Sequence, residues 1–280
     1  MRFETAPAAA PAVPADKPQV SIVLPCYNDA PHLAGNVREI MRTMDTTRWP
    51  YEIILVNDKS PDNCEQIIDG LVEEFPGRVF KLSHEVNKGR GMAVANGMRM
   101  ARGEFAGFLD VDLEVHCRYI PSLVLELEDG ADVVCARRVY KMRLAILHRA
   151  ILSKGYIKMV NNLLDVDMED TEAGYKFFRR ETILPVLLEV ENDRWFWDTE
   201  IMVRSARNGL RVSSVPVLFL RKPEKKSTVK LFSDTMDYLK NLWRFRRQIR
   251  KRGAKGNPAG APSPASHALQ PAGMGAASHV

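Results

Sequence analysis

Short apolar runs alternate with longer segments of helical periodicity between residues 18 and 222 of this 280-residue chain. The runs have the length of buried strands, and each is followed by a turn signal and then by apolar residues at helical spacing. This pattern predicts an α/β domain with a mostly parallel sheet flanked by helices. The predicted strands are Gln19–Leu24, Tyr51–Asn57, Arg78–Leu82, Glu104–Leu109 and Ala131–Cys135.

The two ends of the chain differ in composition from this domain. Residues 1–17 are rich in Ala and Pro, and residues 253–280 are mainly Gly, Pro, Ala and Ser. Both ends lack the large apolar side chains that a core needs, so they are predicted to be disordered. Between the domain and the tail, residues 223–252 are predicted to form a basic, amphipathic helical extension.

Composition indicates a globular protein, with 45% hydrophobic and 27% charged residues. The four cysteines are scattered without a C-x-x-C pair, so neither a disulfide framework nor a zinc site is expected, and a reducing cytoplasm is the expected compartment. Lys or Arg interrupts every long apolar stretch, so no membrane-spanning helix is expected either.

The net charge of +5 is unevenly placed, because Lys and Arg dominate the stretch from Arg244 to Lys255. This block is either a solvated helix end or the partner of an anionic surface. The segments Leu144–Leu164 and Leu231–Ile249 carry apolar residues at helical spacing opposite Lys and Arg. Such helices lie in a membrane interface, pack on the catalytic core, or dock onto a separate membrane-spanning subunit.

Three polar loops follow predicted strands. Asp58 ends the second strand, Lys88 and Arg90 alternate with glycines in the next loop, and Asp110-Val-Asp112 ends the strand Glu104–Leu109. Each loop alone is also consistent with a solvated turn, and Asp-x-Asp alone is a weak signal. Together they lie at the sheet edge where open α/β sheets bind ligands, and they predict a site for a nucleoside diphosphate.

Asp110, Asp112 and Glu114 stand at alternate positions after a buried strand. Alternate side chains share one face, and three like charges on one face repel each other. A divalent cation with oxygen ligands, Mg²⁺ or Mn²⁺, would hold them together and bridge a diphosphate. The alternative is a strand end with solvated acids.

The first half of the chain resembles the family 2 glycosyltransferases, which have the GT-A fold. The motifs that carry the resemblance are Val20–Asn28, Val56–Ser60, Asn87–Gly91 and Phe108–Asp112. The resemblance implies that Pro25, Tyr27 and Asp29 line the base pocket and that Asp58 contacts base or ribose. It further implies that Asp110 and Asp112 hold ribose and metal. Asp29 stands where Glu is commoner in the family.

The second half resembles the dolichyl- and polyprenyl-phosphate sugar transferases of that family, through the segments Asp170–Arg179, Phe196–Glu200 and Arg211–Arg221. The subgroup usually has a Gly-x-Ser-Lys turn after the last segment, whereas Pro223–Lys230 contains no glycine. A phosphate acceptor is already an anion and needs cations rather than a general base. The residues expected to hold it are Arg137, Arg149, Ser153 and Arg221.

The implied reaction is an inverting, metal-dependent transfer of a hexose from a UDP- or GDP-sugar to a polyprenyl phosphate. The enzyme would be peripheral on the cytoplasmic face of a membrane, with no nucleic-acid partner. The acids expected in the reacting centre are Asp112, Asp170, Asp198 and Glu200. If the acceptor were instead a hydroxyl of a glycan or small molecule, Asp198 or Glu200 would be the base. More distant alternatives are a sugar nucleotidyltransferase and a non-catalytic nucleotide-binding protein.

Overall fold

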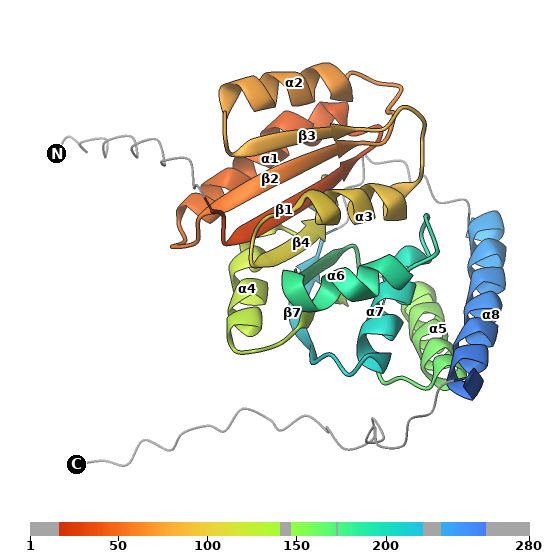
Figure 1. Cartoon of the computed structure of the whole chain (residues 1–280). Helices are drawn as coiled ribbons and strands as arrows, with labels where there is room; N and C mark the ends of the chain where they lie inside the picture. Colours follow the sequence, from red (N-terminus) through yellow and green to blue (C-terminus); the bar gives the residue numbers. More distant parts are fainter. Residues whose placement is uncertain (1–16, 141–146, 172, 221–230, 256–280) are drawn as a thin grey trace, which may run out of the picture.

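The computed structural model describes residues 17–140, 147–171, 173–220 and 231–255 (Figure 1). Most of both predicted disordered ends, the segment around Pro223–Lys230 and Arg221 lie outside these residues. The strands are β1 Val20–Cys26, β2 Tyr51–Asn57, β3 Val79–Ser83, β4 Phe105–Leu109, β5 Val133–Tyr140, β6 Tyr175–Arg179 and β7 Val212–Phe219. The helices are α1 Ala30–Asp45, α2 Cys64–Glu74, α3 Arg90–Met100, the short 3₁₀ helix η1 Cys117–Tyr119, α4 Ile120–Glu128, α5 Leu147–Leu164, α6 Arg180–Glu189, α7 Trp197–Arg207 and α8 Leu231–Lys255.

The seven strands form one sheet in the order β3-β2-β1-β4-β6-β5-β7. β1 pairs in parallel with β2 and β4, and β2 pairs in parallel with β3. β6 is antiparallel to both of its neighbours, whereas β5 and β7 are parallel. The chain moves outward from β1 to β3 and then returns to place β4 on the other side of β1. This reversal of strand order is the position where open α/β sheets bind ligands.

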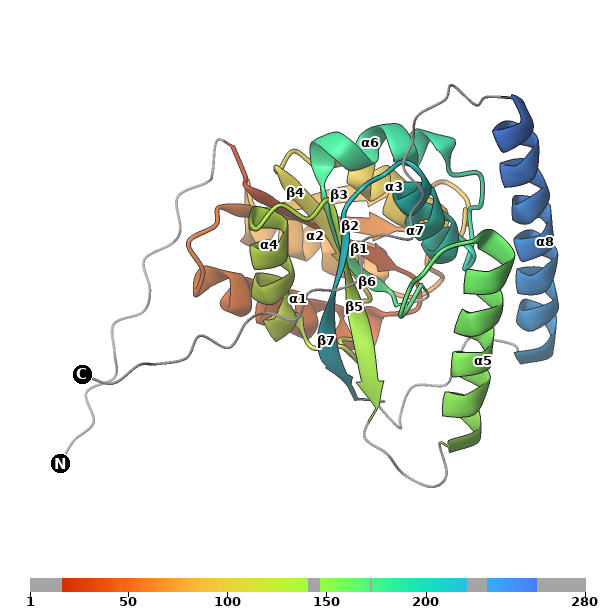
Figure 2. The same ribbon diagram turned by 90° about the horizontal axis from the view of Figure 1, so that it is seen from below.

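Helices cover both faces of the sheet (Figure 2). Alternate residues of β1 show how the strand serves two cores, because Ile22 and Leu24 pack toward α1, α2 and α4, whereas Val23 packs toward α3, α6 and α7. All three side chains are fully buried. The mostly parallel α/β architecture predicted from the sequence is confirmed.

A third, smaller core joins α5, α7 and α8 at one side of the sheet. Leu242 and Phe245 of α8 pack with Val160 of α5 and with Phe196 and Val203 at α7. Among the described helices, none has the length and apolar character needed to cross a membrane.

Candidate functional site

Three loops at the carboxyl ends of β1, β2 and β4 contain residues in the left-handed backbone region. These are Asn28 with φ 59°, Lys59 with φ 55° and Leu113 with φ 52°. Non-glycine residues adopt this region at a cost, and such residues concentrate at binding and catalytic sites. The loops follow the strands on both sides of the strand-order reversal, where the sequence predicted the site.

A chain of four alternating charges joins these loops to the second half of the protein. Arg90 donates from Nε and Nη2 to Oδ1 of Asp110, at 2.9 and 2.7 Å. Its Nη1 donates to Oδ2 of Asp198 at 2.5 Å, and Lys176 Nζ donates to Oδ1 of the same carboxylate at 2.9 Å. Four segments distant in the sequence therefore meet at one point: the loop after β4, the start of α3, β6 and the start of α7.

The surroundings of Asp110 disfavour the charged form of its carboxyl group. Burial raises the pKa of Asp110, Arg90 opposes the rise, and the nearby carboxylates of Asp112 and Asp198 add to it. Although protein surrounds the carboxyl closely, 46% of the Asp110 side-chain surface remains open to solvent. Burial opposes the charge of Arg90, but Asp110 and Asp198 together raise the pKa of Arg90 above its usual value. Asp110 therefore lies between a cation, Arg90, that favours its charge and carboxylates that oppose it.

Gly174 allows the segment before β6 to approach Asp110. A Cβ atom at this position would collide with Asp110 Oδ2 and approach Nη2 of Arg90 to 2.5 Å. Gly91 has a comparable role on the other side of Arg90, because a Cβ there would lie 2.5 Å from Cβ of Trp197. Both glycines are required by close packing around the charged chain.

Asp58 is buried and fixes the loop that carries Lys88 and Arg90. Its Oδ1 accepts a hydrogen bond from the backbone N of Lys88 at 2.8 Å, and its Oδ2 accepts from Gly89 N at 2.9 Å. His84 Nδ1 lies 2.7 Å from Oδ1. The sequence analysis missed His84, although its position directly after β3 places it at the same sheet edge. A contact of Asp58 with base or ribose stays a prediction.

The residues predicted to line the base pocket gather at the end of β1. Tyr27 is 43% exposed, Pro25 is partly buried, and Asp29 is buried with Oδ2 accepting from the backbone N of Tyr27 at 3.0 Å. Asp29 therefore shapes the turn that presents the Tyr27 ring. Lys88 has an exposed side chain beyond β3, at the same carboxyl edge.

The predicted metal ligands follow β4. Asp112 is buried, and its Oδ1 accepts from the backbone N of Glu114 at 3.1 Å, across the turn that Leu113 makes. Within the described part of the chain, Asp110, Asp112 and Glu114 do not bring one oxygen each within 4.8 Å of one another. Carboxylate oxygens are the donors that Mg²⁺ and Mn²⁺ prefer, so the chemistry of these side chains fits either ion. A role for Glu114 as third ligand stays a prediction.

Two of the other candidate acids have their oxygens engaged by the protein. Asp170 accepts from Nε and Nη2 of Arg138, at 2.8 and 3.0 Å. Glu200 is 2% exposed and accepts from the backbone N of Glu191 and Asn192, at 3.1 and 2.9 Å, and from Arg204. Both carboxylates therefore hold loops and arginines in place.

Four residues were predicted to hold an acceptor phosphate, and the structure describes the side chain of one of them, Arg137. Arg137 on β5 is partly exposed, and its Nε lies 3.0 Å from Oε2 of Glu169. Arg149 and Ser153 belong to α5, but their side chains, like Arg221, lie outside the described residues. Their assignment stays a prediction.

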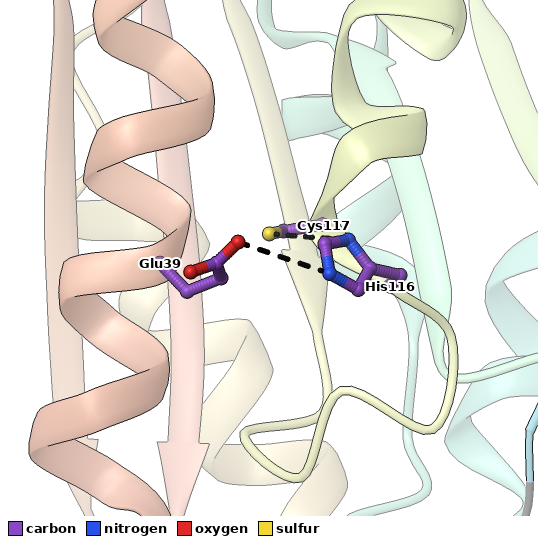
Figure 3. Close-up of side chains that lie close together, drawn as sticks. All are labelled: Glu39, His116 and Cys117. Atoms are coloured by element: carbon purple, nitrogen blue, oxygen red, sulfur yellow. Dashed lines mark hydrogen bonds and ion pairs between the residues drawn. The ribbon is translucent and has the colours of Figure 1, made fainter. Parts of the chain in front are cut away.

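A separate group of possible ligands lies between α1 and the start of η1. Figure 3 shows Glu39 facing His116 and Cys117, with one ligand atom from each within 4.8 Å of the others. Each already has a partner: Glu39 pairs with Arg42 at 2.5 Å, His116 Nδ1 accepts from the backbone N of Arg118 at 3.1 Å, and Cys117 Sγ lies 3.2 Å from Oγ1 of Thr43. Burial raises the pKa of the Cys117 thiol, so it disfavours the thiolate that a metal would need. We therefore assign no metal to this group.

Comparison with known proteins identifies the family of this chain. Glycosyl transferase family 2 matches residues 21–184, which is more than half of the chain. The chain belongs to this family. The family predicted from the sequence motifs is confirmed, and the matched residues include the loops after β1, β2 and β4.

Relatives of this family 2 chain include glycosyltransferase AglD of Haloferax volcanii, which is 33% identical over 219 residues covering 76% of this chain and 34% of AglD. Dolichyl-phosphate β-glucosyltransferase ALG5A of Trichomonas vaginalis is 29% identical over 210 residues, which cover 71% of this chain and 64% of that protein. The chain therefore spans about a third of the length of AglD and somewhat less than two thirds of the length of ALG5A.

Among solved structures, glucosyl-3-phosphoglycerate synthase from Mycobacterium tuberculosis, in complex with Mn²⁺, UDP and phosphoglyceric acid, is similar with a TM-score of 0.62. The sequences are 16% identical, and the match covers 82% of this chain and 78% of that one. At this identity the likeness concerns the fold, and it agrees with the GT-A fold expected from the sequence.

Proposed function

We propose that this chain transfers a hexose, with inversion, from a UDP- or GDP-sugar to a polyprenyl phosphate in a reaction that depends on Mg²⁺ or Mn²⁺. The observation that carries the proposal is the charged chain Asp110–Arg90–Asp198–Lys176 beside Asp112. These carboxylates and cations lie at the strand-order reversal, where open α/β sheets bind ligands, and this supports a nucleoside diphosphate as the ligand. The dolichyl-phosphate β-glucosyltransferases among the relatives support a lipid phosphate acceptor.

The chain's own residues suggest how the donor is held. Tyr27 is exposed at the end of β1 and offers its ring to the base, while Asp29 supports the turn beneath it. The exposed Lys88 offers a charge to the diphosphate from a loop that Asp58 fixes. Asp110 and Asp112 would hold the metal, which when bound neutralises charge on the departing nucleoside diphosphate.

The state of the candidate bases favours an anionic acceptor. A hydroxyl acceptor must lose a proton to a base as it attacks the sugar. Asp170 and Glu200 are engaged by arginines and backbone N–H groups, and Asp198 is held by Arg90 and Lys176. Carboxylate oxygens that already accept from such donors are poorly placed to take a proton from a hydroxyl acceptor. A phosphate oxygen needs no base and would be positioned by Arg137, Arg149, Ser153 and Arg221.

A lipid-linked acceptor implies work at a membrane, and we place the protein peripherally on its cytoplasmic face. The four cysteines are free and buried, which agrees with a reducing compartment. A separate membrane-spanning subunit is a further part of the proposal, for which α5 is the candidate contact.

The test is a transfer assay with labelled UDP- and GDP-sugars and two acceptors, a short polyprenyl phosphate and the corresponding polyprenol. The proposal predicts an acid-labile lipid-linked sugar from the phosphate alone, and loss of the product when the metal is chelated. Transfer to the polyprenol or to a glycan hydroxyl, with none to the phosphate, would contradict it.

A further inference from the structure

The outer face of α8 carries apolar and cationic side chains together. Trp243 is 51% exposed and Met236 is 44% exposed, so these two large side chains remain accessible on a helix whose other side is packed. They line a shallow surface hollow together with Leu239, Lys240, Arg244, Arg247, Gln248 and Lys251. We call these eight residues the α8 outer face.

The spacing of these residues explains why they form one stripe. Steps of three and four residues from Met236 through Lys240, Trp243 and Arg247 to Lys251 keep every side chain on one side of a helix. The 25-residue helix is about 37 Å long, so the stripe extends along much of its length. Phe245, two residues after Trp243, does not lie on this stripe.

Phe245 instead belongs to the opposite side of α8. It is 2% exposed and packs against the Phe196 ring with centroids 5.7 Å apart, while Leu242 beside it is fully buried. The helix is thus fixed on the α5 and α7 core by one face. The outer face is left to a partner outside this core.

The positive charge of the α8 outer face indicates an anionic partner. The face carries four cations, Lys240, Arg244, Arg247 and Lys251, and no acid. Asp237 lies beside it and offsets only Lys240, at 3.5 Å. Cations alone would suit any polyanion, but Trp243 and Met236 among them suit a lipid interface, where aromatic rings lie at the level of anionic head groups.

We infer that the α8 outer face docks on the surface of an anionic lipid bilayer. The same helix also reaches the candidate active site, because Tyr238 bonds to the hydroxyl of Thr199, the residue after Asp198. The Tyr238 ring also packs edge to face on Phe196, with centroids 5.0 Å apart. Docking therefore brings Asp198 close to the surface that would hold a lipid-linked acceptor, a consequence that rests on the proposed function.

The test measures co-flotation of the full chain with vesicles of phosphatidylcholine alone and of phosphatidylcholine mixed with phosphatidylglycerol. We expect binding to the mixed vesicles that weakens with salt. The double variant Arg244→Glu/Arg247→Glu should bind roughly 20-fold or more weakly, at a factor of about five for each cation lost. Trp243→Ala should also weaken binding, and because all three side chains lie on the outer surface, folding should be retained.

The matched control is Arg99→Glu/Arg207→Glu, which changes the net charge by the same amount at exposed positions on α3 and α7. It should bind the mixed vesicles as the unmodified protein does.

Three outcomes would overturn the inference: an equal loss of vesicle binding in both double variants, no binding of the unmodified protein to mixed vesicles, or self-association of the chain through Trp243. Thermal stabilisation by sugar nucleotides is measured in parallel. Vesicle binding without that stabilisation would reject the proposed function and leave the docking surface standing.

Discussion

Lys176 and Asp198 form a buried ion pair, with Nζ of Lys176 2.9 Å from Oδ1 of Asp198 and the lysine side chain fully buried. Lys176 also donates to the carbonyl oxygen of Ala173, so the ammonium group is engaged on two sides. This pair joins β6 to the start of α7. Removing one member of a buried pair leaves the other charge without compensation, which costs several kcal/mol.

Lys176→Met should therefore lower the free energy of unfolding by about 3 kcal/mol, the lower end of the range for a broken buried pair, because Arg90 still compensates Asp198. Denaturant unfolding measures the change. The control is Lys158→Met, at an exposed position of α5, for which a change within about 0.5 kcal/mol is expected. A loss in Lys176→Met as small as in the control would show that Arg90 alone suffices to hold Asp198.

Gly174→Ala should impair donor binding more than stability. The added Cβ meets Asp110 Oδ2 and Nη2 of Arg90, so the two side chains must shift from the geometry that the metal site needs. We expect affinity for the sugar nucleotide to fall about tenfold or more, which is about 1.4 kcal/mol.

The matched control for this substitution is Gly70→Ala in α2, where a Cβ would meet no described atom within 4 Å. That variant should bind the donor normally and gain about 0.5–1 kcal/mol in stability, because alanine is favoured over glycine inside a helix. Normal donor affinity in Gly174→Ala would show that the contact with Asp110 is not needed for binding.

Asp62 should give the protein a pH-dependent contribution to stability. Its carboxylate accepts from Ala30 N at the start of α1 and from Cys64 N at the start of α2, both at 3.0 Å, and from Ser60 Oγ at 2.6 Å. Burial opposes ionisation, but the hydrogen bonds from Cys64, Ser60 and Ala30 lower the pKa of Asp62 to about 2. An unfolded Asp has a pKa of about 3.9.

Because the folded pKa is the lower one, this stabilisation is complete above about pH 4 and is lost as the pH falls toward 2. Asp62→Ala should cost about 1–2 kcal/mol at pH 7, as expected for an acid that caps helix N termini, and less at pH 3. Denaturant unfolding at the two pH values measures this, with the exposed Asp167→Ala as control. A cost that is the same at both pH values would mean that the charge of Asp62 does not contribute.

Local pattern was sufficient to predict the first five strands and the loops after them, but it did not predict β6 and β7. The predicted strand Tyr51–Asn57 has these bounds in the structure, and β1 begins one residue later than predicted and ends two residues later. Buried parallel strands are short apolar runs, and the loops after them carry Asp58 and Asp110, so sequence order alone places these residues at one edge.

The partners of the acids could not be predicted, because they come from segments far apart in the chain. Arg90 and Asp198 are 108 residues apart, and no local pattern relates them. Arg137 and Arg138 are adjacent in the sequence. Successive side chains of β5 point to opposite faces of the sheet, and only this arrangement in the fold determines that Arg138 reaches Asp170. The side of α8 that faces the core depends on Phe196 and Val203, which no helical periodicity reveals.

The central claim is that Asp110 and Asp112 form a metal-dependent site for a sugar nucleotide. Calorimetric titration of UDP- and GDP-sugars into the protein, with Mn²⁺ and with a chelator, tests it most directly. We expect one of the donors to bind with Mn²⁺, at least about tenfold more weakly without it, a difference of about 1.4 kcal/mol, and not detectably to Asp112→Ala. Binding of equal strength with and without metal, unchanged in Asp112→Ala, would contradict the claim.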